Sequence, residues 1–124
     1  MVNIKRLIEL RDNVLPFIPP KQLKMETWTG YHDELPNGCG TVACVAGWAG
    51  VHPPFNADGY HLEPKLEGGF RPSYSGSYAR CPVSQVRSFF DLAGEEFEYI
   101  FGAFQPNDPV LIAQHITDVI EADA

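Results

Sequence analysis

The chain has 124 residues, of which 44% are apolar and 12% aromatic, and it carries a formal net charge of −7. This composition supplies one hydrophobic core and excludes wholesale disorder, which requires low hydrophobicity as well as high net charge. Because no apolar run approaches the roughly 20 residues that cross a bilayer, and because acidic residues repel phosphates, neither a membrane protein nor direct nucleic-acid binding is expected.

A helix is predicted close to the N-terminus, because apolar residues recur there at spacings of three, four and seven. Asn3 is the expected N-cap. Pro16 is expected to end the helix, because proline lacks an N–H donor and clashes with the preceding turn. Residues 19–38 indicate an irregular connection that Trp28 and Tyr31 anchor to the core. The predicted apolar stripe consists of Ile4, Leu7, Ile8, Val14 and Leu15.

The next predicted helix is the most distinctive segment, because residues 41–51 contain no charged side chain. A helix that is apolar all round is buried, so we expect this one at the centre of the fold, with Thr41 as its cap and Trp48 in the core. Each glycine inside a helix costs about 1 kcal/mol relative to alanine. Gly47 and Gly50 therefore indicate that a neighbouring helix or loop approaches the helix closely.

Residues 52–80, here called the insertion, differ in character because prolines and glycines alternate with aromatic residues and helical periodicity is absent. Two extended stretches, near Tyr60–Glu63 and Phe70–Tyr74, are predicted to pair across Gly68–Gly69 as a hairpin. A segment of this length without regular structure is usually functional or mobile.

Helical periodicity returns after the insertion. Pro82 is expected to begin one helix, Gly94 to separate it from a second, and Asp108–Pro109 to begin the last. The chain is thus predicted to be mainly α: a small bundle of about five helices around a buried central helix, in a single domain over residues 1–124 with the insertion at 52–80. The predicted apolar faces consist of Val83, Val86, Phe89 and Phe90, then of Phe97, Ile100, Phe101 and Phe104, and then of Leu111, Ile112, Ile116, Val119 and Ile120.

Negative charge is concentrated towards the C-terminus, because residues 88–124 contain no Lys or Arg and have a formal net charge of −8. Such asymmetry creates a field that attracts a basic partner and repels nucleic acid. A solvated acidic face that aids solubility is the alternative interpretation. The acidic residues are Asp91, Glu95, Glu96, Glu98, Asp108, Asp118, Glu121 and Asp123.

The three cysteines indicate reduced thiols in the cytoplasm, because their number is odd and the N-terminal residues do not resemble a signal peptide. No C-x-x-C pair occurs, and neither a metal nor another cofactor is expected. Cys39 is a weak candidate nucleophile, because a thiol at a helix start has a lowered pKa. His61 or His115 would then be the base of a cysteine enzyme. The alternative is that Cys39 is a small buried residue.

The same helix start offers a further alternative, because free backbone N–H groups at Gly38, Gly40 and Thr41 can bind an anion. The segment lacks the Gly-x-x-x-x-Gly-Lys pattern that is typical of nucleoside triphosphate binding. A protein that sequesters nucleotides, with Arg71 or Arg80 as the neutralising charge, is therefore kept as an alternative.

The segment Cys39–Ala49, CGTVACVAGWA, resembles a C-G-T-x-x-C-[VIL]-A-G-W-A signature of small, mostly uncharacterised proteins of phages and their bacterial hosts. Phe90–Phe101 resembles a later, helical part of the same pattern. The resemblance implies a phage or prophage setting and carries no activity to transfer. The insertion is not part of the pattern, so a function particular to this chain is expected there.

Tyr, Phe and Arg are enriched at protein interfaces, which makes the insertion a candidate binding segment beside the acidic region. The alternative is that the insertion folds back over the core, and Cys44, Trp48 and His115 are interpreted as core packing. We expect a non-enzymatic binding protein, namely a phage-encoded modulator or inhibitor of a host protein with a basic surface. An anti-CRISPR inhibitor whose acidic surface mimics nucleic acid is one version. The predicted partner-binding residues are Tyr60, Phe70, Arg71, Tyr74, Tyr78, Arg80, Glu95 and Glu98.

Overall fold

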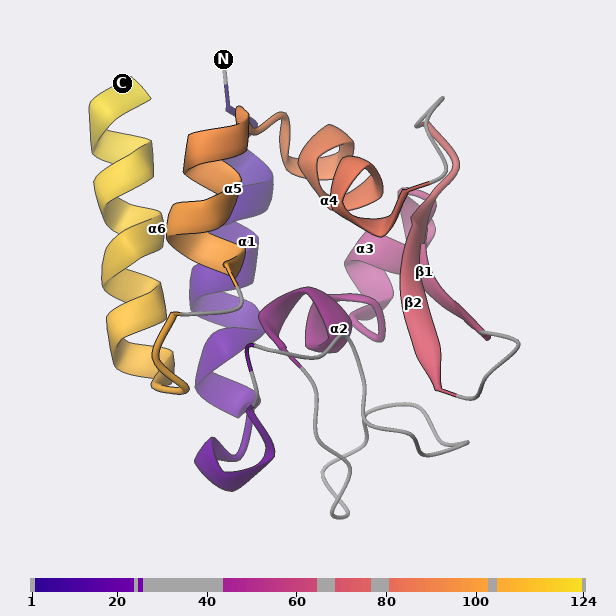
Figure 1. Ribbon diagram of the computed structural model, residues 1–124, viewed down its shortest axis with the longest axis horizontal. Helices are drawn as coiled ribbons and strands as arrows, with labels where there is room; N and C mark the ends of the chain where they lie inside the picture. The colour runs from indigo at the N-terminus through magenta and orange to yellow at the C-terminus, as the bar shows by residue number, and fades with distance from the viewer. Residues whose placement is uncertain are drawn as a thin grey trace.

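The structure, a computed structural model, describes residues 2–23, 25, 44–64, 69–76, 81–102 and 105–123. In these ranges the fold is mainly helical, as predicted, with a small two-stranded sheet at one side (Figure 1). None of the described helices combines the length and the hydrophobicity needed to cross a membrane. The elements are α1 Ile4–Asn13, two short 3-10 helices at Leu15–Phe17 and Pro20–Gln22, α2 Val45–Ala49, α3 Pro53–Ala57, β1 Tyr60–Pro64, β2 Phe70–Tyr74, α4 Pro82–Phe90, α5 Gly94–Phe101 and α6 Pro109–Asp123.

The start of α1 confirms the predicted cap, because the side chain of Asn3 accepts a hydrogen bond from the backbone N–H of Arg6 at 3.1 Å. Its buried face differs from the predicted stripe. Leu7 and Leu10 are fully buried, whereas Ile8 is 38% exposed. The prediction for Ile8 was wrong. Residues 4, 7 and 8 and residues 7, 10 and 14 both have the spacing of one helical face, and only the packing of neighbouring elements decides which face is buried.

The buried central helix is shorter than predicted. The helix α2 begins at Val45, with Cys44 in extended conformation at its N-cap, so its start lies beyond Thr41, which is outside the described residues. All five residues of α2 are buried, as an uncharged helix should be. The ring of Trp48 fills the core, and its indole N–H donates to the carbonyl of Gln22 at 3.1 Å.

Gly50 follows α2 and confirms a close approach, although the neighbour is a strand and not the helix or loop that was predicted. A Cβ atom at this position would lie 2.5 Å from Cγ of Leu62, on β1. We expect Gly50→Ala to lower the free energy of unfolding by about 1–3 kcal/mol, because an added methyl group forces the packed strand to move. Gly94→Ala is the matched control, since a Cβ there would meet no atom closer than Arg87 at 3.9 Å. Equal urea midpoints for the two variants would contradict this packing.

The insertion contains one element that the sequence did not predict. Residues Pro53–Ala57 form α3, with prolines in the first helical positions and Phe55 buried. The hairpin is confirmed, because β1 and β2 pair antiparallel with Tyr60 opposite Tyr74. Gly69 precedes β2 with a φ of +74°, the left-handed conformation that glycine adopts readily. The hairpin packs on α4 through β2 (Figure 1).

The chain between α4 and α5 turns at a different residue from the predicted one. Asp91 ends α4 in the left-handed conformation, with a φ of +54°, and Gly94 is the first residue of α5. The last helix begins as predicted, because the side chain of Asp108 accepts from the backbone N–H of Val110 at 2.9 Å. On α6, Leu111 is 45% exposed, so its placement on the buried stripe was wrong. The buried residues of α6 are Ile112, Ile116 and Val119.

Candidate binding surfaces

Tyr60, the first of the predicted partner-binding residues, belongs to the core. Its side chain is fully buried, its ring stacks on Phe89 with centroids 4.6 Å apart, and its hydroxyl donates to the carbonyl of Ala46 at 2.8 Å. Burial raises the pKa of Tyr60 well above its usual value, because the phenolate would lose its hydration. The binding role predicted for Tyr60 was therefore wrong, and the insertion folds over the core at this point.

The rest of the hairpin is less deeply buried. Tyr74 is half-buried, and its ring packs edge-on against Phe89 with centroids 5.1 Å apart. Phe70 is partly exposed at the start of β2. The guanidinium of Arg71 donates to the carboxylate of Glu63 at 2.9 Å. The charge of Arg71 is thus already paired within the hairpin, which argues against its predicted role of neutralising a bound nucleotide. The remaining two predicted residues, Tyr78 and Arg80, lie outside the described residues.

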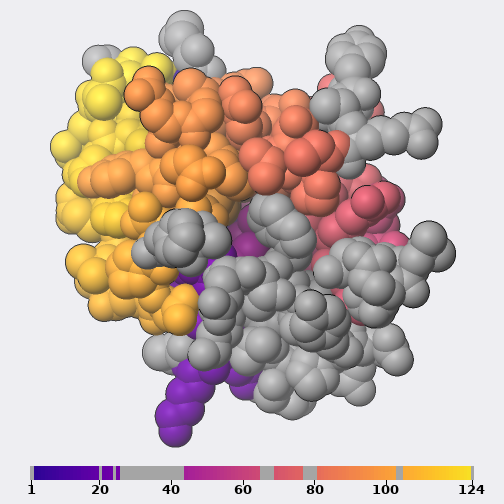
Figure 2. Space-filling view, in the orientation of Figure 1, coloured from indigo at the N-terminus to yellow at the C-terminus, as the bar shows by residue number. Residues whose placement is uncertain are grey.

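The helices α5 and α6 carry six of the eight acidic residues of 88–124, and the two helices adjoin on one face of the molecule (Figure 2). All eight acidic residues of 88–124 lie in the described part of the chain, and each is exposed or partly exposed, although one carboxylate oxygen of Asp123 is buried. Glu95 and Glu98, both predicted, are exposed on α5. The charge asymmetry of the sequence is therefore largely a surface property.

An aromatic pair that the sequence did not predict as a site joins the two helices. The rings of Tyr99 on α5 and His115 on α6 stack with centroids 4.2 Å apart. The Tyr99 hydroxyl donates to Asp118 at 2.7 Å, and Gln114 donates to the same carboxylate at 2.9 Å. The hydrogen bond from Tyr99 holds the pKa of Asp118 below its usual value. His115 was predicted to be a core residue, and it lies instead partly exposed on this outer surface.

The aromatic pair and its neighbours on the two helices are here called the α5–α6 surface, and the contacts of Tyr99 with His115 and Asp118 join its two halves. Tyr99 is 40% exposed and Leu111 is 45% exposed, so apolar area accompanies the carboxylates. The helical spacing of three and four places the members from each helix on one side of that helix. The surface consists of Glu95, Glu98 and Tyr99 of α5 and of Leu111, Gln114, His115 and Asp118 of α6.

The cysteines differ strongly in accessibility. Cys44 is buried, as predicted, and burial raises the pKa of its thiol to about 11, whereas Cys81 is exposed. Cys39, the candidate nucleophile, lies outside the described residues. His61, one of its candidate bases, is exposed on β1. Among the residues that the structure places, no group of three or more His, Cys, Asp or Glu side chains could hold a metal ion.

We expect iodoacetamide to alkylate Cys81 in the native protein and to spare Cys44, because the reagent needs an accessible thiolate. Peptide mass spectrometry after a short incubation near neutral pH measures the modified fraction at each cysteine. Unfolding in urea should remove the difference. Labelling of Cys44 at the rate of Cys81 in the native state would contradict the burial of α2.

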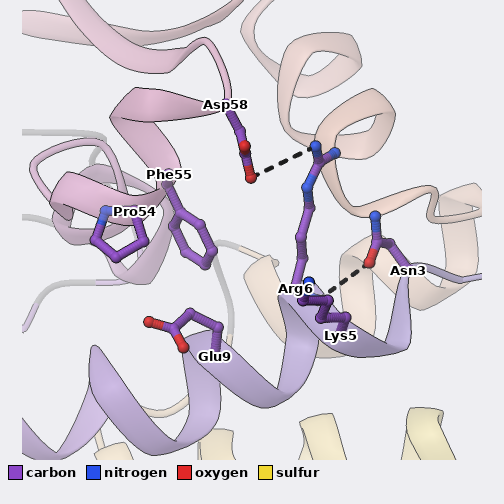
Figure 3. A pocket seen from close by; sticks show the side chains of 7 residues that line it. All are labelled: Asn3, Lys5, Arg6, Glu9, Pro54, Phe55 and Asp58. Atoms are coloured by element: carbon purple, nitrogen blue, oxygen red, sulfur yellow. Dashed lines mark hydrogen bonds and ion pairs between the residues drawn. The ribbon is translucent and has the colours of Figure 1, made fainter.

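A cleft opens between α1 and α3 on another part of the surface, with a volume of about 440 Å³ (Figure 3). Arg6 stands in its wall. One guanidinium nitrogen of Arg6 donates to the carbonyl of Phe89 at 2.8 Å, and the guanidinium lies over the Phe89 ring at 4.1 Å. A second nitrogen faces Asp58 at 3.7 Å. The α1–α3 cleft is lined by Asn3, Lys5, Arg6, Glu9, Pro54, Phe55 and Asp58.

Glu9, at the edge of this cleft, forms a hydrogen bond with His52 that joins α1 to the start of α3, with Glu9 Oε2 and His52 Nε2 2.6 Å apart. Asn13 donates to the other oxygen of Glu9 at 2.8 Å. These hydrogen bonds, the one from His52 first, hold the pKa of Glu9 below its usual value of 4.5. The carboxylate is thus stabilised in its charged form.

This depressed pKa predicts a loss of stability in acid. A carboxylate whose pKa is lower in the folded state stabilises the protein above about pH 4.5, and the contribution disappears as the pH falls through the folded pKa. We expect Glu9→Gln to lose less stability than the wild type between about pH 5 and about pH 3. Urea denaturation at each pH measures this, and equal slopes for the two proteins would contradict it.

In comparisons with known proteins, no family model matches this chain, and neither a curated protein nor a solved structure matches it.

Proposed function

We propose that this chain is a non-enzymatic binding protein that docks onto a basic surface of a partner protein through the α5–α6 surface. The observation that carries the proposal is the stacked pair of the exposed Tyr99 and the partly exposed His115, set among carboxylates. This pair lies in a part of the sequence that contains no Lys or Arg. Solubility alone would explain the carboxylates, and the exposed apolar area of Tyr99 and Leu111 beside them supports a binding role.

The two kinds of residue would act at different ranges. Carboxylates such as Glu95 and Glu98 attract a basic partner over several ångströms and raise the association rate. Tyr99 and Leu111 act at contact distance, where buried aromatic area slows dissociation. The hydrogen bond from Tyr99 to Asp118 fixes the orientation of the ring before binding, which reduces the entropy that binding costs.

The resemblance of Cys39–Ala49 to the phage signature leads us to propose a setting as well. In it, the protein is a phage-encoded modulator or inhibitor that acts on a host protein in the host cytoplasm. A host protein that binds nucleic acid fits best, because a surface that neutralises phosphates is basic and accepts carboxylates in their place. An anti-defence inhibitor of the anti-CRISPR type is one such protein.

Capture of a partner from a bacterial lysate, followed by measurement of the complex with variants, tests this function. We expect Tyr99→Ala to weaken the complex by about 2 kcal/mol or more, mainly through faster dissociation. His61→Ala, which also removes an exposed ring, is the matched control and should bind as the wild type does. Circular dichroism checks that both variants are folded. Wild-type affinity of Tyr99→Ala, or failure to capture any stoichiometric partner, would contradict the proposal.

A further inference from the structure

The α1–α3 cleft places opposite charges on its two sides. Lys5 and Arg6 approach from α1, and Asp58 approaches from the end of α3 (Figure 3). Pro54 contributes apolar surface beside them, and the buried ring of Phe55 forms the base of the cleft at this point. A volume of about 440 Å³ lies within the range of small-molecule sites, roughly 300–1,000 Å³.

The guanidinium of Arg6 is held in place by Phe89. Its hydrogen bond to the Phe89 carbonyl and its position over the Phe89 ring fix its orientation. The nitrogen that faces Asp58 is 3.7 Å from the carboxylate, which is longer than a hydrogen bond. A carboxylate from a ligand could therefore reach this nitrogen at a shorter distance than Asp58 does.

The other charged groups of the cleft differ in how far they are already engaged. Both oxygens of Glu9 are used, one by His52 and the other by Asn13. The side chain of Asp58 is 53% exposed, and its one ion pair among the described residues is the long one to Arg6. Lys5 is exposed and has no ion pair with a described residue. Lys5 is thus available to a ligand, and Arg6 and Asp58 can reach one by giving up the long ion pair between them.

We propose that the α1–α3 cleft binds a small zwitterion with one carboxylate and one ammonium group, that is, a free α-amino acid. The ligand carboxylate lies on Arg6 and Lys5, its ammonium group lies on Asp58, and its side chain lies along Pro54. A phosphate or another dianion is disfavoured, because Asp58 stands next to the same guanidinium. This ligand site is independent of the α5–α6 surface.

Thermal unfolding with each free L-amino acid in turn tests the ligand class. We expect at least one of them to raise Tm by roughly 3 °C or more at saturation. Its N-acetyl derivative, which has no ammonium group, and its carboxamide, which has no carboxylate, should both leave Tm unchanged. If no amino acid raises Tm, the proposal is overturned. If the N-acetyl derivative stabilises as well as the amino acid does, the cleft is a simple anion site and the proposal is also overturned.

Variants then locate the site by calorimetric titration with the stabilising amino acid. Asp58→Asn and Lys5→Gln change exposed side chains, so both should fold, and each should weaken binding about tenfold. Lys21→Gln, an equal change of charge at another exposed lysine, is the control and should bind as the wild type does. Glu98→Lys, on the α5–α6 surface, should also bind the amino acid normally, so failure of the proposed docking function and failure of this site are distinguishable. Wild-type affinity of Asp58→Asn would overturn the proposal.

Discussion

Replacing Tyr60 by alanine is expected to lower the free energy of unfolding by about 3–5 kcal/mol, because the substitution empties a fully buried site. The ring packs against Phe55, Phe89 and Phe90, so α3 and α4 lose their common contact with β1. Urea denaturation followed by circular dichroism measures the change.

Tyr60→Phe separates the hydroxyl from the ring. It should cost only about 1 kcal/mol, because the Ala46 carbonyl still accepts the backbone N–H of Gly50 after the hydroxyl is lost. His61→Ala, at the next and exposed position of β1, should change stability by less than about 0.5 kcal/mol. If Tyr60→Ala were as stable as His61→Ala, the ring would not be in the core, and a binding role for Tyr60 would return.

Trp48→Ala is expected to cost a similar amount, about 3–5 kcal/mol, because it removes the largest side chain of α2 from the core. The loss includes the hydrogen bond that ties the indole to the carbonyl of Gln22. Thermal unfolding of the variant should begin well below that of the wild type. Trp48→Phe keeps most of the apolar area and should lose less than Trp48→Ala. An unchanged Tm for Trp48→Ala would contradict a buried α2.

The features that the sequence predicted well are local in origin. The cap at Asn3 and the helix start at Asp108–Pro109 depend on side-chain groups within three residues of the backbone that they satisfy. The hairpin was found because extended, aromatic stretches flank a glycine pair. Such signals need no knowledge of the rest of the fold.

The features that were missed depend on tertiary contacts or on rare backbone conformations. The helix α3 is too short for periodicity to be visible, since it has five residues. The left-handed turn at Asp91 has no glycine to mark it. Ile8 and Leu111 lie on acceptable helical stripes, and only the positions of neighbouring helices leave them exposed.

The candidate site divides in the same way. The acidic character of α5 and α6 follows from composition alone, and the structure places Glu95 and Glu98 on the surface as predicted. The stack of Tyr99 on His115 depends on how α5 and α6 are aligned against each other, and residue spacing within a single helix does not predict that alignment. Tyr99 did carry one signal, because it lies off the apolar stripe of α5 that Phe97 and Ile100 define.

The role of the acidic charge is tested most directly by the association rate constant of the captured partner, measured over a range of salt concentrations. For the wild type, the rate should be high at low salt and fall steeply as salt screens the carboxylates. Glu95→Lys with Glu98→Lys should associate about tenfold more slowly at low salt, with a flatter salt dependence. Asp12→Lys on α1 is the control for the single variant Glu98→Lys, because the two substitutions change the charge equally. The association rate and salt dependence of Asp12→Lys should equal those of the wild type. Identical rates and salt slopes for the wild type and the double variant would contradict docking through the α5–α6 surface.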